Sequence, residues 1–222
     1  MTIITTHALE ANASSFASPE NVQRIMQRPL IVGASVSADW AAKSPGKLLA
    51  LRYTDESQIR TIAFGGKSGR EVLKNVSDET LGDRTVVIGL DLFFWDATLR
   101  SSEESLSALK RLMSAVEKLQ IPIILGEVPL LMPGMQPQAA AINQAIHAAC
   151  RSYPNCTVVP FTSMLFKILK EGSLTYKGSR YGLRDLIPDG LHIGPIASQY
   201  IADSIYESLH RDGDGRFEKL AR

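Results

Sequence analysis

The chain has 222 residues, a formal net charge of +1, 45% hydrophobic residues and 21% charged residues. A globular domain of this length buries a full core without help from disulfides or metals. The near-zero charge gives no reason to expect a nucleic-acid partner, and the absence of any run of 18 apolar residues predicts no membrane span.

Sequence signals place alternating helices and strands along the chain. Residues 1–17 have no period and predict a loose arm, whereas Ser18 followed by Pro19 and Glu20 predicts a helix start. The polar tail at 213–222 is expected to fray, which leaves one domain at residues 18–212. In chain order, the predicted elements are a helix at 18–28, a strand at 29–32, a helix at 45–53, a strand at 59–64, a helix at 68–76, a strand at 84–94, a helix at 102–120, a strand at 121–129, a helix at 136–153, a strand at 156–161, and helices at 163–172 and 194–210.

This alternation predicts an α/β fold of three layers, in which helices cover both faces of a parallel sheet. We expect five strands in the order 2-1-3-4-5. Ligands of such sheets bind outside the carboxyl ends of the strands, at the switch point of the topology. The loops to search for chemistry are therefore 33–40, 65–70, 90–97 and 127–134.

Two segments, one of these loops and one near the end of the chain, carry candidate catalytic side chains. Ser35 lies in a tight turn after the first strand, where a serine serves either as a nucleophile or as an ordinary turn residue. Residues 188–194, PDGLHIG, place Asp189 three residues before His192. The pair is either a turn that holds two polar residues by chance, or a general base with the carboxylate that orients it.

The loop GGKSGR at 65–70 does not fit a phosphate-binding loop, because Thr61 stands where that motif requires glycine. A better interpretation is that the backbone N–H of Gly69 is aimed at an anion.

Taken in order, these blocks resemble the SGNH hydrolases, also called the GDSL family of lipases, esterases and acyltransferases. The matching segments are IVGASVS, GGKSGREVL, VVIGLDL and PDGLHIG, and the resemblance runs from about residue 29 to 210. It implies a flavodoxin-like fold with Ser35 as the nucleophile, His192 as the general base and Asp189 as its orienting residue. It also implies an oxyanion hole that includes the amides of Ser35 and Gly69, with position 91 as its third member.

The sequence departs from the family at two positions. Ala34 replaces the usual aspartate, and Asp91 replaces the asparagine of the oxyanion hole. An ionised carboxylate at ~4 Å from the oxyanion costs about 4 kcal/mol, so Asp91 is protonated, is turned away, or weakens the chemistry. If it is protonated and donates to the oxyanion, Asp91→Asn is expected to raise kcat about ten-fold or more.

The sequence therefore predicts a serine esterase or acyl-transferring hydrolase that acts on a small or medium acyl ester. The alternative is a catalytically silent binding domain that keeps the fold. The apolar segments at 92–95 and 130–135 are either an acyl pocket or ordinary packing. No cofactor or metal is expected, and nothing indicates the oligomeric state.

The remaining expectations concern the cellular location and the cysteines. The first 20 residues lack the charged and apolar regions of a secretory signal, which favours a cytoplasmic protein, with a processed secreted form as the alternative. Cys150 and Cys156 are too few for a disulfide framework. The interpretation favoured for them is two reduced thiols, with a local bridge as the alternative.

Overall fold

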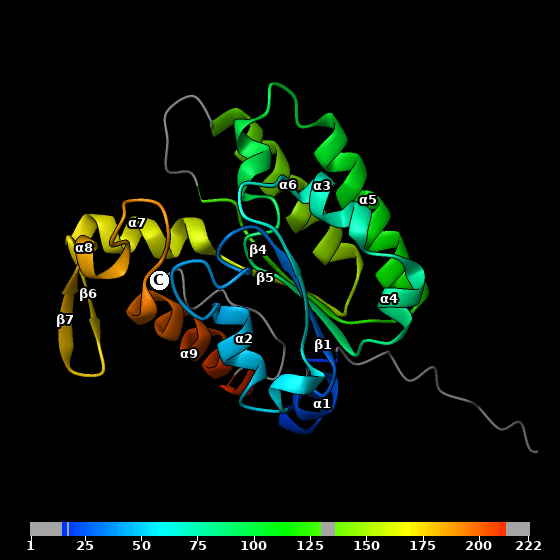
Figure 1. The fold of residues 1–222 in the computed structure, drawn as a ribbon, viewed down its shortest axis with the longest axis horizontal. Coiled ribbons are helices and arrows are strands. Elements are labelled where there is room, and N and C mark those ends of the chain that lie inside the picture. Colours follow the sequence, from blue (N-terminus) through cyan, green and yellow to red (C-terminus); the bar gives the residue numbers. More distant parts are fainter. Residues whose placement is uncertain (1–14, 17, 130–135, 212–222) are drawn as a thin grey trace, which may run out of the picture.

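The computed structural model describes residues 15–16, 18–129 and 136–211. At its centre lies a parallel five-stranded sheet in the order β2-β1-β3-β4-β5 (Figure 1). The order predicted from the sequence is thus confirmed. The strands are β1 (Pro29–Gly33), β2 (Arg60–Ala63), β3 (Val86–Gly89), β4 (Ile123–Gly126) and β5 (Cys156–Val159).

Helices cover both faces of this sheet (Figure 1). One face carries α3 (Gly69–Val72), α4 (Asp78–Gly82), α5 (Glu103–Lys118) and α6 (Gln136–Ser152). The other carries α1 (Pro19–Ile25), α2 (Pro45–Ala50), α7 (Phe161–Glu171) and α9 (Pro195–Arg211). The short 3-10 helices are η1 (Glu56–Gln58), η2 (Leu73–Asn75) and η3 (Phe94–Thr98).

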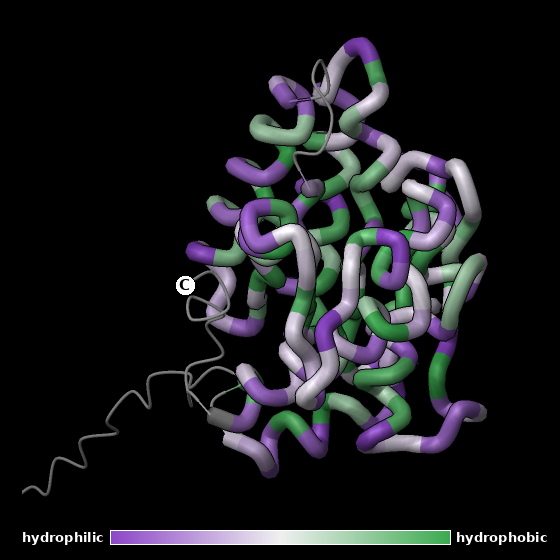
Figure 2. The backbone as a smooth tube through the Cα atoms, turned by 90° about the vertical axis from the view of Figure 1, so that its left-hand side faces the viewer, coloured by the Kyte–Doolittle hydropathy of each residue, from purple (hydrophilic) through white to green (hydrophobic). Residues whose placement is uncertain are grey.

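The apolar strands contribute side chains to two separate cores, because successive side chains of a strand point to opposite faces of the sheet. Leu30 packs with the α3–α6 layer, whereas Ile31 packs with the α1, α2, α7 and α9 layer. Hydrophobic segments accordingly lie inside the molecule and hydrophilic turns outside (Figure 2). Continuous apolar strands are what a sheet covered on both faces requires.

The predicted helix start at Ser18 is confirmed, since its side chain accepts a hydrogen bond from the amide of Asn21 and α1 begins at Pro19. The predicted boundary of the arm is less accurate. Phe16 is fully buried in the second core, and the amide of Ser15 donates to the side chain of Asn155. The remaining residues of the predicted arm and the tail at 213–222 lie outside the described residues.

An antiparallel hairpin was missed by the sequence analysis. β6 (Ser173–Tyr176) pairs with β7 (Ser179–Gly182), and the short helix α8 (Leu183–Leu186) follows. Both turn residues, Lys177 and Gly178, have positive φ, which is the geometry of a two-residue hairpin turn. The hairpin and α8 lie beside α7, at one side of the molecule (Figure 1).

The hairpin is held to α9 by polar and apolar contacts. Asp203 of α9 accepts hydrogen bonds from the hydroxyl of Tyr176 and from Gln199, and it pairs with Lys177 and Arg52. Leu174 of β6 packs in a small core with residues of α8 and α9. Burial of Asp203 raises the pKa of its carboxyl group, but the four donors that bind it lower this pKa by more. The net effect is a pKa below the usual range.

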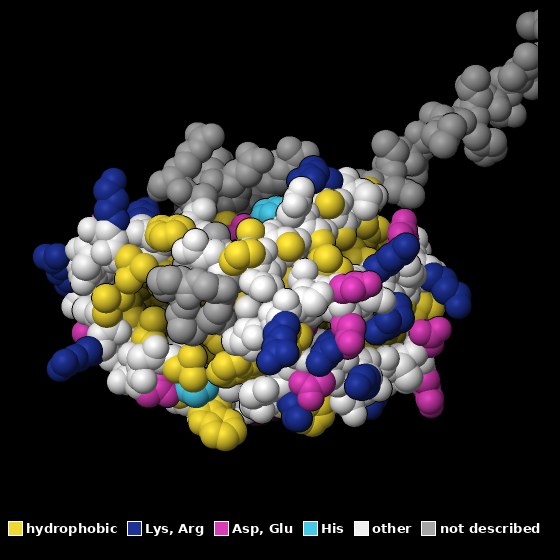
Figure 3. Space-filling model, turned by 90° about the horizontal axis from the view of Figure 1, so that it is seen from above, with side chains coloured by type: hydrophobic (Ala, Val, Ile, Leu, Met, Phe, Trp, Pro, Cys, Tyr) yellow, Lys and Arg dark blue, Asp and Glu magenta, His cyan; other side chains and the backbone are white. Residues whose placement is uncertain are grey.

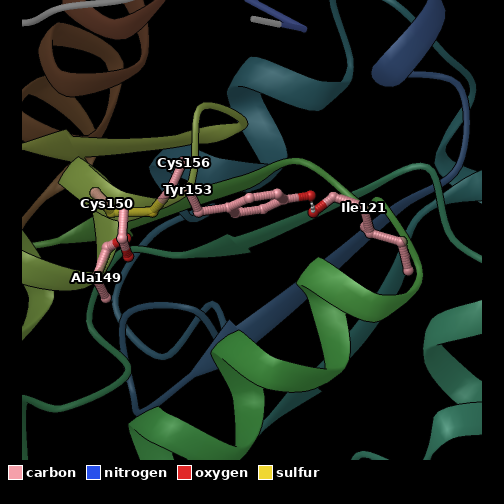
Figure 4. Close-up of a disulfide and its surroundings, with 6 residues drawn as sticks. Ile121, Ala149, Cys150, Tyr153 and Cys156 are labelled. Atoms are coloured by element: carbon pink, nitrogen blue, oxygen red, sulfur yellow. Dashed lines mark hydrogen bonds between the residues drawn. A yellow bond between two sulfur atoms is a disulfide. The ribbon is translucent and has the colours of Figure 1, made fainter. Parts of the chain in front are cut away.

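A disulfide joins Cys150, at the end of α6, to Cys156, at the start of β5 (Figure 4). The interpretation of these cysteines as reduced thiols is therefore wrong in this structure, and the local bridge is present. Tyr153 lies between them in sequence, and its hydroxyl donates to the carbonyl of Ile121 at 3.1 Å. The bridge fastens the edge strand β5 to α6, and the hydrogen bond fastens the loop between them to Ile121, just before β4.

No helix among the described residues is long and apolar enough to span a bilayer.

Candidate active site

The turn after β1 presents Ser35 at the carboxyl edge of the sheet. Three backbone hydrogen bonds close this turn, and the last of them runs from the amide of Trp40 to the carbonyl of Ser35 at 3.1 Å. Gly33 ends the strand where only glycine fits. A Cβ there would lie 2.1 Å from Asp91 Oδ1 and 2.4 Å from Ser37 Oγ. The turn is thus tightly packed directly beneath the candidate nucleophile.

Asp91, which follows β3, points into this turn. Its Oδ2 accepts hydrogen bonds from the amides of Val36 at 2.9 Å and Ser37 at 3.2 Å, and its Oδ1 accepts one from Ser37 Oγ at 2.5 Å. Burial raises the pKa of Asp91, while these donors pull in the opposite direction. Both oxygens of Asp91 thus bind donors of the turn, while its raised pKa agrees with the protonated form and its side chain also lines a cavity beside the turn.

This orientation argues against a direct hydrogen bond from Asp91 to an oxyanion. Both of its oxygens already act as acceptors for donors of the turn. A carboxylate with three such donors fixes backbone geometry. The residue therefore supports the turn that carries Ser35.

The prediction for Gly69 also needs correction. Its amide donates to Oδ2 of Asp96 at 2.5 Å, so it is not free for an oxyanion. Asp96 is fully buried, and that burial raises its pKa. Gly65 and Gly66, which precede Gly69 in the same loop, are better placed to donate to an oxyanion on Ser35. A Cβ on Gly65 would lie 3.8 Å from the Cβ of Ser35, and among the described residues no acceptor engages the amides of Ser35, Gly65 or Gly66.

His192 and Asp189 form the pair that the sequence predicts. Nδ1 of His192 lies 2.6 Å from Oδ2 of Asp189. The other carboxylate oxygen accepts from the amides of Leu191 at 2.9 Å and His192 at 2.6 Å, which folds the loop between α8 and α9 around the carboxylate. The His192 amide, the imidazole and the Leu191 amide hold the pKa of Asp189 well below its usual range.

This arrangement orients the imidazole. The hydrogen bond at Nδ1 directs Nε2 away from the carboxylate, where it is free to act on a nucleophile. The side chain of His192 is only 14% exposed, whereas Asp189 is half exposed. Among the described contacts there is no hydrogen bond between Ser35 and His192. Their partnership therefore stays a prediction.

Trp40, which the sequence analysis did not single out, connects the two halves of the site. Its ring stacks on the His192 ring with centroids 6.2 Å apart and planes 14° apart. A Cβ on Gly65 would lie 2.9 Å from the same indole. Since the Trp40 amide also binds the carbonyl of Ser35, this residue places His192, the glycine loop and Ser35 in one neighbourhood. Its position in the loop 33–40 was the available sequence signal.

An apolar cavity opens beside these residues. It is lined by Val36, next to Ser35, and by Leu191 and Ile193, on either side of His192. Phe93 and Phe94, from the segment 92–95, also line it. Residues 130–135, the other segment expected to form an acyl pocket, lie outside the described residues. Figure 3 shows hydrophobic side chains around a hollow on the side of α7, α8 and the hairpin.

A second histidine–carboxylate pair lies at the same edge of the sheet. Nε2 of His147 lies 2.7 Å from Oε1 of Glu127, and the other oxygen of Glu127 accepts from the amide of Thr162 at 3.0 Å. Thus both oxygens of Glu127 have protein partners. Within the described part of the chain, no group of three or more His, Cys, Asp or Glu side chains is placed to hold a metal ion.

The chain resembles several solved structures. It superimposes on the psychrotrophic esterase EstA from Pseudoalteromonas sp., in a structure inhibited by monoethylphosphonate, with a TM-score of 0.58, 19% identity, and coverage of 81% of this chain and 94% of that chain. For the acetylxylan esterase Axe2 from Geobacillus stearothermophilus, the TM-score is 0.61, the identity 15% and the coverage 84% and 95%.

A member of the lipolytic G-D-S-L family from Veillonella parvula gives a TM-score of 0.56 at 14% identity, covering 81% of this chain and 97% of that chain. No family model matches the sequence. No curated protein matches it either. The structural likenesses confirm the fold that the sequence resemblance implied.

Proposed function

We propose that this chain, which has the fold of the SGNH hydrolases, is a serine esterase with Ser35 as nucleophile, His192 as general base and Asp189 as the residue that orients it. The hydrogen bond from His192 to Asp189 at 2.6 Å carries the proposal. It selects one tautomer of the imidazole and stabilises the imidazolium that forms when the base accepts a proton.

The proposed reaction has two steps. In the first, His192 removes the proton of the Ser35 hydroxyl while Oγ attacks the ester carbonyl carbon. The tetrahedral intermediate collapses when His192 returns that proton to the leaving alcohol, which leaves an acyl group on Ser35. In the second, His192 activates a water that attacks the acyl carbon, and the acid departs.

The oxyanion of both intermediates needs hydrogen-bond donors, and the unoccupied amides supply them. We assign the amide of Ser35 and an amide of the loop at Gly65 and Gly66, in place of Gly69 and Asp91. Each such donor is worth about two to three decades in rate.

The acyl group is proposed to enter the apolar cavity. Val36 connects the cavity to the nucleophile, and Leu191 and Ile193 connect it to the base. Each methylene that this lining buries contributes about 0.8 kcal/mol to binding, whereas a buried hydroxyl or charge without a partner is unfavourable. A small or medium acyl ester is therefore the expected substrate.

Covalent labelling tests this proposal directly. A fluorophosphonate is expected to add once to the native protein, and peptide mass spectrometry should locate the adduct on Ser35. Ser35→Ala should take up no label. Ser37→Ala removes a neighbouring hydroxyl of the same turn and should still be labelled on Ser35. Hydrolysis of p-nitrophenyl esters from acetate to decanoate then measures the acyl preference.

The alternative, a silent binding domain, makes the opposite prediction. A folded native protein that takes up no label and hydrolyses none of these esters would support it and contradict the esterase proposal.

A further inference from the structure

Trp40 is the most exposed of the large hydrophobic side chains described, at 68% of its surface. Exposing so much of an indole to water is unfavourable, because each Å² of apolar surface costs about 25 cal/mol. The ring is not left loose, however. It stacks on His192 and lies against Gly65, so a flat apolar surface is held in place beside the candidate catalytic residues.

The chemistry of the proposed reaction, on which this inference rests, tells which half of the substrate meets that surface. When the tetrahedral intermediate collapses, the bond between the carbonyl carbon and the alcohol oxygen breaks. The proton that His192 took from Ser35 passes to that oxygen. The leaving alcohol must therefore lie within hydrogen-bond reach of the imidazole, and so close to the ring stacked on it.

The acyl half lies elsewhere. The cavity assigned to it is lined by Val36, Leu191 and Ile193, and Trp40 is not among its described lining residues. Trp40 thus stands outside the acyl pocket but next to the base. The two halves of an ester on Ser35 would meet different surfaces, one enclosed and aliphatic, the other open and flat.

We propose that Trp40 is a specificity-determining residue that binds the alcohol half of the substrate, and that this alcohol carries a flat ring. An exposed indole offers a stacking face, which an aromatic ring exploits and a short open chain does not. The contact is made with the leaving group, so it affects the choice of alcohol and leaves the choice of acyl chain to the cavity.

Two esters of the same acid test the proposal. Benzyl butyrate and ethyl butyrate release alcohols of similar acidity, so their chemical steps are matched. The ratio of their kcat/KM values then reports recognition of the alcohol. We expect the native protein to prefer the benzyl ester, and Trp40→Ala to reduce that ratio about three- to ten-fold, the value of one aromatic pair. Trp40→Phe should restore much of it.

The control is Phe166→Ala, which removes another exposed aromatic ring, on α7 and outside the described cavity lining. It should leave the ratio unchanged. If Trp40→Ala slows both esters equally, the residue merely supports the loop and the proposal is overturned. An unchanged rate on both esters overturns it as well.

A binding measurement separates this proposal from the proposed function. Saturation-transfer NMR with benzyl alcohol on Ser35→Ala should show transfer to the aromatic protons, and the double variant Ser35→Ala/Trp40→Ala should not. If the native protein hydrolyses neither ester, the esterase proposal fails, while the binding result still decides the role of Trp40. Equal transfer in both variants overturns that role.

Discussion

Asp91 is expected to act through the turn that carries Ser35, and replacing it tests this directly. Three donors reach its carboxylate: the amides of Val36 and Ser37 and the hydroxyl of Ser37. In Asp91→Ala all three lose their acceptor. An unsatisfied buried donor costs about 1–3 kcal/mol. Because water will enter part of the vacated space, we expect a total loss of about 2–4 kcal/mol.

For a chain of this length, 1 kcal/mol shifts Tm by about 2–4 °C, so Asp91→Ala should melt about 4–16 °C below the native protein. Its kcat should fall about 100-fold, because displacing the nucleophile by about 1 Å costs that much. Differential scanning fluorimetry and hydrolysis of p-nitrophenyl butyrate measure the two effects on the same samples.

Asp91→Asn is the informative comparison. Its amide oxygen can still accept from both backbone N–H groups, and its NH2 can donate to Ser37 Oγ, which also accepts hydrogen bonds. We therefore expect a loss of less than about 1 kcal/mol and a kcat within about ten-fold of native. The control Ser37→Ala removes only the hydroxyl contact.

Two results would refute this reasoning. An Asp91→Ala protein that melts with the native protein would show that the carboxylate does not hold the turn. An Asp91→Asn protein that is ten-fold or more faster than native would mean that the native charge acts on the oxyanion, as the sequence alone had suggested.

Three further predictions follow from single contacts. Asp189→Asn should lower kcat by about 10⁴ through the wrong imidazole tautomer, and a kcat within ten-fold of native would contradict the orienting role. Hydrogen bonds from Ser68 and Lys67 lower the pKa of Glu71 from 4.5 to about 2, so its contribution to stability is full above pH 4.5 and lost as the pH falls toward 2. Urea unfolding at several pH values should show that the native protein is more stable than Glu71→Gln above pH 4.5 and loses this difference in the free energy of unfolding as the pH falls toward 2. A difference that stays constant with pH would contradict the role of Glu71. Breaking the Cys150–Cys156 bridge with reductant should lower the free energy of unfolding by about 2 kcal/mol. The control is Cys150→Ser, whose free energy of unfolding should not respond to reductant. If reductant leaves that of the native protein unchanged as well, the bridge adds no stability.

Local signals in the sequence determined much of this protein. Continuous apolar strands between amphipathic helices predicted a parallel sheet covered on both faces, because burial on two sides demands such strands. The loop PDGLHIG predicted the Asp189–His192 pair for a similar reason. The carboxylate and the groups that it binds lie within three residues of each other, so the contact is settled by one turn of the backbone.

The hairpin β6–β7 was missed although its signal is also local. Each strand has only four residues, and the basic segment KGSRYGLR at 177–184, which includes the second strand, resembles a solvated loop. The turn at Lys177 and Gly178 was the remaining clue.

Tertiary structure decided the contacts of the residues around Ser35. Asp91 lies 54 positions from Ser37, and Asp96 lies 27 from Gly69. Whether each carboxylate faces an oxyanion, a turn or a helix amide depends on how separate loops pack at one edge of the sheet. The same holds for Trp40 against His192 and for the bond between Cys150 and Cys156. The sequence shows which groups reach that edge, but their orientation is set by contacts between distant segments, which neither periodicity nor motif spacing encodes.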